Sequence, residues 1–204
     1  LMGGKDNYIK KMDAIFTTKP SSDYSYYGFK IHEILEMELA GMGQYAHGNQ
    51  PIQHAIYLYN YAQQPWKTQE KVRYVMDNLY GSGADGYCGD EDNGQTSAWF
   101  VFSSLGFYPV APVTGQYVIG SPLFEEVSIK LSNGKELKIN AHENSDKNIF
   151  INSFKFNQLE SNNNWIDHSN LKEGGIIDFE MSRTPNLNWG ANKNSVPYSM
   201  SKNQ

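Results

Sequence analysis

The sequence has little of what marks disulfide-rich, membrane or nucleic-acid-binding proteins. Its single cysteine, Cys88, excludes a disulfide within the chain and leaves the cellular compartment open. No stretch approaches the roughly 18 apolar residues of a membrane-spanning helix, so we expect no membrane span. Acidic residues outnumber lysine and arginine by 22 to 17, and the net charge of -5 argues against a nucleic-acid partner.

Glycine and acidic residues are concentrated in the segment 81–94, where Asp90, Glu91 and Asp92 are consecutive. Adjacent like charges are costly unless water, a cation or a substrate satisfies them. The apolar, helix-like segment 96–105 follows at once. The pattern therefore predicts a loop that delivers carboxylates to a helix N-terminus, as a general base or as cation ligands. The alternative is a solvated acidic turn, with Asp92 or Asn93 as an ordinary N-cap.

The first half of the chain has the apolar periodicity of helices. We expect helices over 5–16, 30–39, 51–62, 66–80 and 96–105. In the second of these, His32 and Glu36 share a face with Glu33 beside them. These polar residues form either a solvated face or a group directed into a pocket. In the helix 66–80, the residues expected to stay in solvent are Lys67, Glu70, Lys71 and Arg73.

Beyond Pro109 and Pro112 the apolar residues alternate as they do in strands. Candidate strands are 117–120, 127–131, 137–141, 149–151, 154–156 and 176–181, and Asn133-Gly134 is a hairpin turn. We expect an α+β fold in two parts: a helical part over 1–110, and a small antiparallel β unit over 111–204. Carboxylates and aromatic loops on a helical scaffold favour carbohydrate chemistry. The sequence has no P-loop, GxSxG or cysteine/histidine metal motif.

Several segments, in chain order, resemble glycoside hydrolase family 92, the calcium-dependent exo-acting α-mannosidases. They are HGNQP at 47–51, GYCGDEDNGQTSAW at 86–99, GFYPV at 106–110 and YVIGSPLF at 117–124. Many members have Asn-Glu-Pro where this chain has Asn49-Gln50-Pro51, and Asn-Glu-Asp where it has Asp90-Glu91-Asp92. The resemblance implies that 1–110 is the C-terminal portion of an (α/α)6 barrel and that 111–204 packs on the barrel or on its β-sandwich.

The resemblance also implies hydrolysis of terminal α-mannose with inversion, which requires a general acid and a separate general base. Asp92 is the base that it indicates, with Asp90 in a supporting or shared role. The family's general acid lies in an upstream Glu-Gly-Asn segment that is not in this chain. The chain also opens on Leu1-Met2-Gly3, without a recognisable signal peptide. We therefore expect a segment of a longer enzyme whose remainder supplies the acid.

Further implications of the resemblance concern the cation and the substrate. Calcium is expected, with oxygen ligands from Glu36, Asn49, Gln50 and Asp92. His32 and Glu33 occupy the place of the leaving-group subsite in α-1,2-specific members. The expected substrate is a mannose-containing glycan, and the expected location is the periplasm or the exterior of a bacterium. The alternative is a carbohydrate-binding or structural fragment without turnover.

Overall fold

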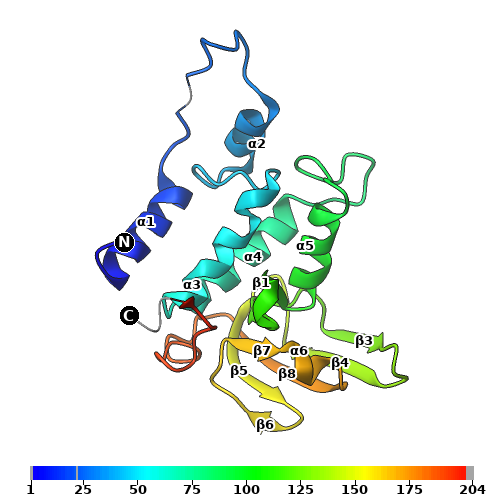
Figure 1. Ribbon diagram of the computed structural model, residues 1–204. Coiled ribbons are helices and arrows are strands. Elements are labelled where there is room, and N and C mark those ends of the chain that lie inside the picture. The colour runs from blue at the N-terminus through cyan, green and yellow to red at the C-terminus, as the bar shows by residue number, and fades with distance from the viewer. Residues whose placement is uncertain (1, 22, 201–204) are drawn as a thin grey trace. The chain divides into compact units, whose positions relative to one another are not determined.

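The computed structural model describes residues 2–21 and 23–200. The chain divides into two compact units. Unit 1 consists of Leu1–Ala55 and Tyr74–Phe100, and unit 2 of Ile56–Arg73 and Val101–Gln204. The expected division near residue 110 stays a prediction. The mixture of helices and strands agrees with the α+β expectation (Figure 1).

Four of the expected helices are present within a few residues of their expected bounds: α1 (Lys5–Thr17), α2 (His32–Ala40), α4 (Pro65–Asn78) and α5 (Gln95–Ser104). The expected α-helix 51–62 is wrong for most of its length. It is a 3₁₀-helix, η1 (Gln50–Tyr57), that ends in one α-helical turn, α3 (Leu58–Tyr61). Apolar residues spaced over so short a segment fit a period of 3.0 as well as one of 3.6, so the pattern does not separate the two helix types.

In unit 2, β1 (Phe107–Ala111), β2 (Gln116–Ile119) and β7 (Trp165–Asp167) form an antiparallel sheet in that order. A second sheet has the order β3-β4-β8-β5-β6. Its strands are β3 (Glu126–Lys130), β4 (Glu136–His142), β5 (Phe150–Phe156), β6 (Leu159–Glu160) and β8 (Gly175–Ser182). The short helices η2 (Pro112–Thr114) and α6 (His168–Leu171) complete the unit.

The expectation of an antiparallel β unit needs one correction, because β4 pairs with β8 in parallel, from Leu137 beside Gly175 to His142 beside Glu180. The other described strand pairs are antiparallel. The cause is topological. Strand β8 inserts between β4 and β5, and it is antiparallel to β5. Sequence alternation predicts strands but does not give their order in a sheet.

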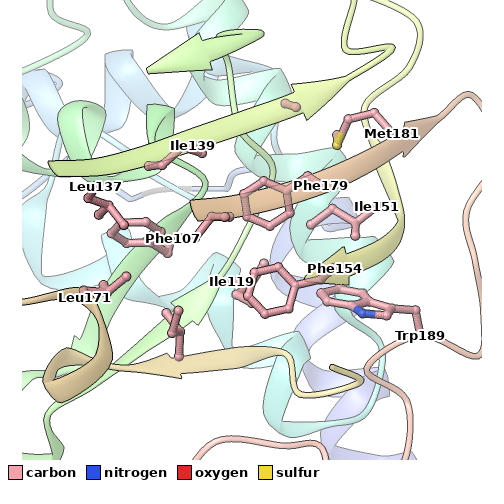
Figure 2. Close-up of a cluster of buried hydrophobic side chains, with 13 residues drawn as sticks. Phe107, Ile119, Leu137, Ile139, Ile151, Phe154, Leu171, Phe179, Met181 and Trp189 are labelled. Carbon is pink, nitrogen blue, oxygen red and sulfur yellow. The ribbon is translucent and has the colours of Figure 1, made fainter. Parts of the chain in front are cut away.

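The core of unit 2 lies between these strands (Figure 2). Ile139 of β4, Ile151 of β5 and Phe179 of β8 are each at most 1% exposed. The phenyl rings of Phe154 and Phe179 pack with their centroids 5.3 Å apart. Burial of such side chains supplies most of the stabilising free energy of a β unit. Unit 2 therefore has a hydrophobic core of its own.

Candidate functional site

The acidic segment lies in unit 1, in the loop 81–94 between α4 and α5, as the sequence predicts. The base of this loop is closed by a bridge between Tyr80 and Tyr87 and by a hydrogen bond of 2.9 Å from Gly81 N to Gly86 O. At its end, Asp92 and Asn93 have φ angles of 46° and 57°, which is left-handed backbone. Asp and Asn tolerate this region better than other non-glycine residues. The loop thus reaches α5 through a tight turn that leaves the Asp92 side chain exposed.

Glu91 caps the start of α5. Its carboxylate accepts hydrogen bonds from Ser97 N at 3.4 Å and from Ser97 Oγ at 2.9 Å. A carboxylate at a helix N-terminus is stabilised by the unpaired backbone N–H groups there. In the alternative of a solvated acidic turn, Asp92 or Asn93 was the expected N-cap. In the structure the cap is Glu91, which lies between the two candidate catalytic acids in the sequence. Asp90 and Asp92 therefore lie on either side of a fixed side chain.

Amide and hydroxyl groups hold the backbone at Asp90. Gln50 Nε2 donates to Asp90 O at 2.6 Å, and Thr96 Oγ1 donates to the same carbonyl at 2.8 Å. Gln53 Nε2 donates to His47 O at 3.2 Å and lies 3.4 Å from Thr96 Oγ1. Segments 40 residues apart in the sequence are thereby joined, since Gln50 and Gln53 belong to η1 and Thr96 to α5. Gln53 and Thr96 were missed in the sequence because neither stands out in composition.

A buried histidine lies behind this loop. His47 is 1% exposed, and its Nδ1 and Nε2 lie 2.7 Å and 2.8 Å from the hydroxyls of Tyr45 and Tyr80. Tyr80 donates its proton to Thr96 O, so His47 Nε2 donates to Tyr80 and Nδ1 accepts from Tyr45. Burial lowers the pKa of His47 to about 3. The imidazole is therefore a neutral, fixed support for the start of α5.

The first turn of α2 brings polar side chains to the loop. His32 Nε2 lies 3.5 Å from Asp90 Oδ2 and 3.4 Å from Glu33 Oε1. The His32 and Asp90 side chains are more than half exposed, which leaves them open to a ligand. The structure thus gathers His32, Glu33 and Asp90, which the sequence assigned to a leaving-group subsite and to catalysis.

Glu36 lies one turn further along α2, against two glycines. A Cβ atom on Gly89 would lie 2.5 Å from the Cα of Gly48 and 2.8 Å from Glu36 Oε2, so side chains larger than hydrogen do not fit there. Glu36 Oε2 is buried and accepts no hydrogen bond from the described part of the chain. Burial raises the pKa of Glu36. The nearby charge of His32 opposes this rise, and the charges of Glu33 and Asp90 add to it. This oxygen is therefore suited to a bound cation or to a proton.

A cavity of about 430 Å³ opens beside Glu36 in unit 1. Polar and aromatic side chains line it together, among them Asn78, Tyr80, Asp85 and Tyr87. Such a lining offers hydrogen bonds and ring faces to the same ligand, as a sugar requires.

That Glu36, Asn49, Gln50 and Asp92 share a bound cation stays a prediction. The side-chain N–H of Gln50 donates a hydrogen bond to Asp90 O, so the side-chain oxygen of Gln50 remains for another partner. The side chains of Asn49 and Asp92 are exposed. Across the described residues, no group of three or more His, Cys, Asp or Glu side chains is arranged to hold a metal ion. The donors are nonetheless carboxylate and amide oxygens, the type that Ca²⁺ prefers. No helix of the described ranges has the length and apolar character needed to cross a membrane.

A family model for the glycosyl hydrolase family 92 catalytic domain matches residues 1–183. A curated relative, an uncharacterized secreted glycosidase of Arthroderma benhamiae, is 30% identical over 156 residues. That match covers 75% of this chain and 20% of the relative.

Solved structures agree with the family model. A family 92 inverting mannosidase of Bacteroides thetaiotaomicron is 50% identical, with a TM-score of 0.83, over 98% of this chain and 27% of that protein. A second family 92 α-mannosidase of the same species, solved with mannoimidazole, is 34% identical, with a TM-score of 0.87, over 97% of this chain and 25% of that protein. The chain thus spans about a quarter or less of the length of these relatives.

Proposed function

Because the chain belongs to the catalytic domain of glycosyl hydrolase family 92, we propose that it is part of a longer enzyme that removes terminal α-linked mannose from glycans with inversion. The observation that carries this proposal is the loop 81–94. Its backbone is held at Asp90 by Gln50 and Thr96, and its carboxylates lie beside the polar first turn of α2. The remainder of the longer enzyme supplies the general acid.

In this mechanism Asp92 is the general base. The exposed carboxylate accepts a proton from the water that attacks the anomeric carbon, on the face opposite the departing sugar. Asp90 lies two residues earlier and has a supporting or shared role in this step. Glu91 and Thr96 are positioning residues, since they fix the turn that presents both acids. A tightly held loop lowers the cost of orienting the base in the transition state.

Calcium is the proposed cofactor, bound by Glu36, Asn49, Gln50 and Asp92. The buried Glu36 Oε2 supports this assignment, because it accepts no hydrogen bond from the described residues and is too costly to leave ionised without a partner. A bound Ca²⁺ would supply positive charge and would accept the hydroxyl oxygens of the sugar as ligands. The chain's own part is to hold these oxygens on α2, on residues 49 and 50 at the start of η1 and on the loop 81–94.

The test of the reaction is Asp92→Asn in the full-length protein. The amide has the shape of the carboxylate but does not accept the proton, so kcat should fall by about 10²–10⁴-fold. Asp6→Asn, on an exposed residue of α1 in the same unit, serves as the matched control and should retain activity. Mannose release from an α-mannoside is measured, with ¹H NMR of the first product anomer to establish inversion. Turnover by Asp92→Asn close to the wild-type value would remove Asp92 from the mechanism.

We assign His32 and Glu33 to the leaving-group subsite, with α-1,2-linked mannose as the substrate. These residues approach Asp90 from the exposed first turn of α2, which suits contact with the second sugar. His32→Ala should therefore reduce kcat/KM for α-1,2-mannobiose more than kcat/KM for an aryl α-mannoside, which has no second sugar. Equal losses on both substrates would show that His32 serves the whole site.

The secreted fungal relative supports a location outside the cytoplasm, and we propose the periplasm or the cell exterior. The second candidate function is a carbohydrate-binding or structural part without turnover. The observation that favours it is that the chain covers only 20% and 27% of the length of two relatives. If the full-length protein hydrolyses an α-mannoside and the Asp92→Asn variant does not, the protein is an enzyme and the second candidate is excluded.

A further inference from the structure

The connection between α1 and α2 carries exposed aromatic side chains, and we call its residues 23–30 the aromatic loop. The side chains concerned are Tyr24, Tyr26, Tyr27 and Phe29, which are 41%, 92%, 59% and 62% exposed. Clustered exposed apolar side chains mark an interaction site more often than isolated ones do. Figure 1 shows residues 23–30 and the loop 81–94 toward the same end of unit 1.

The aromatic loop has a defined conformation of its own. Tyr27 N and Gly28 N both donate to Tyr24 O, at 3.1 Å and 3.0 Å, which closes a turn. Asp23 Oδ1 accepts a hydrogen bond of 2.9 Å from Ser25 N. Gly28 completes the turn with a φ of 73°, a value that glycine adopts without strain. Backbone and polar groups therefore shape the loop, and the aromatic rings are left facing outward.

The aromatic loop is also tied to the candidate site. Lys30 Nζ lies 2.8 Å from Glu38 Oε2 of α2 and 5.8 Å from the centroid of the Tyr24 ring. Two residues later, His32 lies 3.5 Å from Asp90. Even a fully extended chain places the Cα of Tyr26 within roughly 20 Å of the Cα of His32. A glycan that enters the site over α2 is thus within reach of the loop.

We propose that the aromatic loop binds the outer sugar residues of the glycan, beyond the two sugars joined by the bond that is cut. This inference rests on the proposed function. A tyrosine ring offers an apolar face to the C–H groups of a pyranose and a hydroxyl at its wet edge. The segment 24–29 contains no charged side chain, and the tyrosine, serine and glycine in it are the residues that make adaptable, weakly polar binding surfaces elsewhere.

The site and the loop have different roles under this proposal. The groups around Asp90 act on the terminal mannose and its neighbour, so they determine catalysis on every substrate. The aromatic loop contributes the same binding free energy to the ground state and to the transition state of a long glycan, and none to a short substrate. Uniform binding of this kind lowers KM and leaves kcat unchanged.

The test uses the full-length protein with the variants Tyr26→Ala, Tyr26→Phe and Tyr198→Ala. Tyr198 is a matched control, because it is a 49% exposed tyrosine of unit 2. Each variant is assayed on α-1,2-mannobiose and on a larger branched oligomannoside. For Tyr26→Ala we expect KM for the oligomannoside to rise about three- to tenfold, with kcat and the mannobiose kinetics unchanged. Tyr26→Phe keeps the ring and should stay within about twofold of wild type.

Unchanged oligomannoside kinetics in Tyr26→Ala would overturn the inference. So would equal losses on both substrates, or a lower melting temperature with altered oligomeric state, since these outcomes would make the loop a contact with other protein. If the wild-type protein hydrolyses no α-mannoside, the proposed function fails. Isothermal titration of the oligomannoside into wild type and Tyr26→Ala then decides on the loop, which is supported by weaker binding in the variant and refuted by equal binding.

Discussion

Arg73 holds two loops of unit 2 to α4. Its side chain is 4% exposed, and its guanidinium donates to Pro122 O at 3.0 Å, to Ser145 O at 3.0 Å and to Asn144 Oδ1 at 2.8 Å. Hydrogen bonds from a charged donor are stronger than neutral ones, and a buried acceptor that loses its donor costs free energy. Arg73 therefore stabilises unit 2 through backbone groups that have no regular strand partner.

Replacing Arg73 with methionine tests this role. Arg73→Met keeps much of the apolar stem but leaves two buried acceptors, Pro122 O and Asn144 Oδ1, and one part-buried acceptor, Ser145 O, without their donor. The free energy of unfolding should therefore fall by about 3 kcal/mol. Denaturant unfolding of the full-length protein measures the change. Glu70→Gln, on the exposed side of the same helix, is the control and should change stability by less than about 0.5 kcal/mol. A similar small change in both variants would show that water replaces the guanidinium.

The same residue shows a limit of prediction from sequence. The amphipathic pattern placed Arg73 in solvent, and that prediction is wrong. A long charged side chain at the edge of an apolar face is exposed in most helices, and its burial here depends on loops 49 and more residues away. The site shows the same contrast. The acids of the loop 81–94 could be predicted from local composition. Gln53 and His47 instead act through contacts with Thr96 and Tyr80, which lie 43 and 33 residues further along the chain.

At the scale of elements, Gly48 lies between Glu36 of α2 and Gly89 of the loop 81–94. The backbone of Gly48 lies so close to Gly89 and to Glu36 that neither glycine has room for a side chain. This contact sets where the first turn of α2 lies relative to the catalytic candidates. It also shields Glu36 Oε2 from water.

We expect Gly48→Ala to separate these elements. The added methyl overlaps the Glu36 carboxylate and lies 2.9 Å from Gly89 Cα, which should cost about 1–3 kcal/mol of stability. Displacement of Glu36 should also weaken calcium binding, measured by calorimetric titration. Gly81→Ala is the matched control, because a Cβ there meets its nearest neighbour at 3.8 Å. Unaltered melting temperature and calcium affinity in Gly48→Ala would mean that the backbones move apart freely.

Helices and strands with a clear periodic spacing of apolar residues were predicted well. The pairing of the strands in the sheet was not. The helices 5–16 and 66–80 could be predicted from the spacing of apolar residues and from the proline and glycine residues at helix boundaries. The hairpin of β3 and β4 follows from Asn133-Gly134, since Gly134 has a φ of 80°. The parallel pairing of β4 and β8 depends on a return of the chain after some 30 residues, which local patterns do not encode.

At the scale of the whole molecule, we propose that this chain supplies one wall of a site in a longer enzyme. Its candidate calcium ligands come from three stretches of unit 1, namely α2, the start of η1 and the loop 81–94. Treatment of the full-length protein with EDTA should therefore abolish mannose release, and Ca²⁺ should restore it better than Mg²⁺, which demands a tighter octahedral shell. Mannose release is assayed before and after dialysis. Full activity after exhaustive chelation would contradict the calcium assignment.

The order of the two units along the chain has a consequence for the gene. Unit 2 takes up 56–73 between the two stretches of unit 1, and then everything from 101 onward. No single break in the polypeptide therefore yields both units whole. A break before 56 separates unit 1 from its stretch 74–100, and a break after 100 leaves 56–73 on the wrong fragment. An end-to-end fusion of two ancestral genes would give each unit one uninterrupted stretch, which is not the arrangement in this chain.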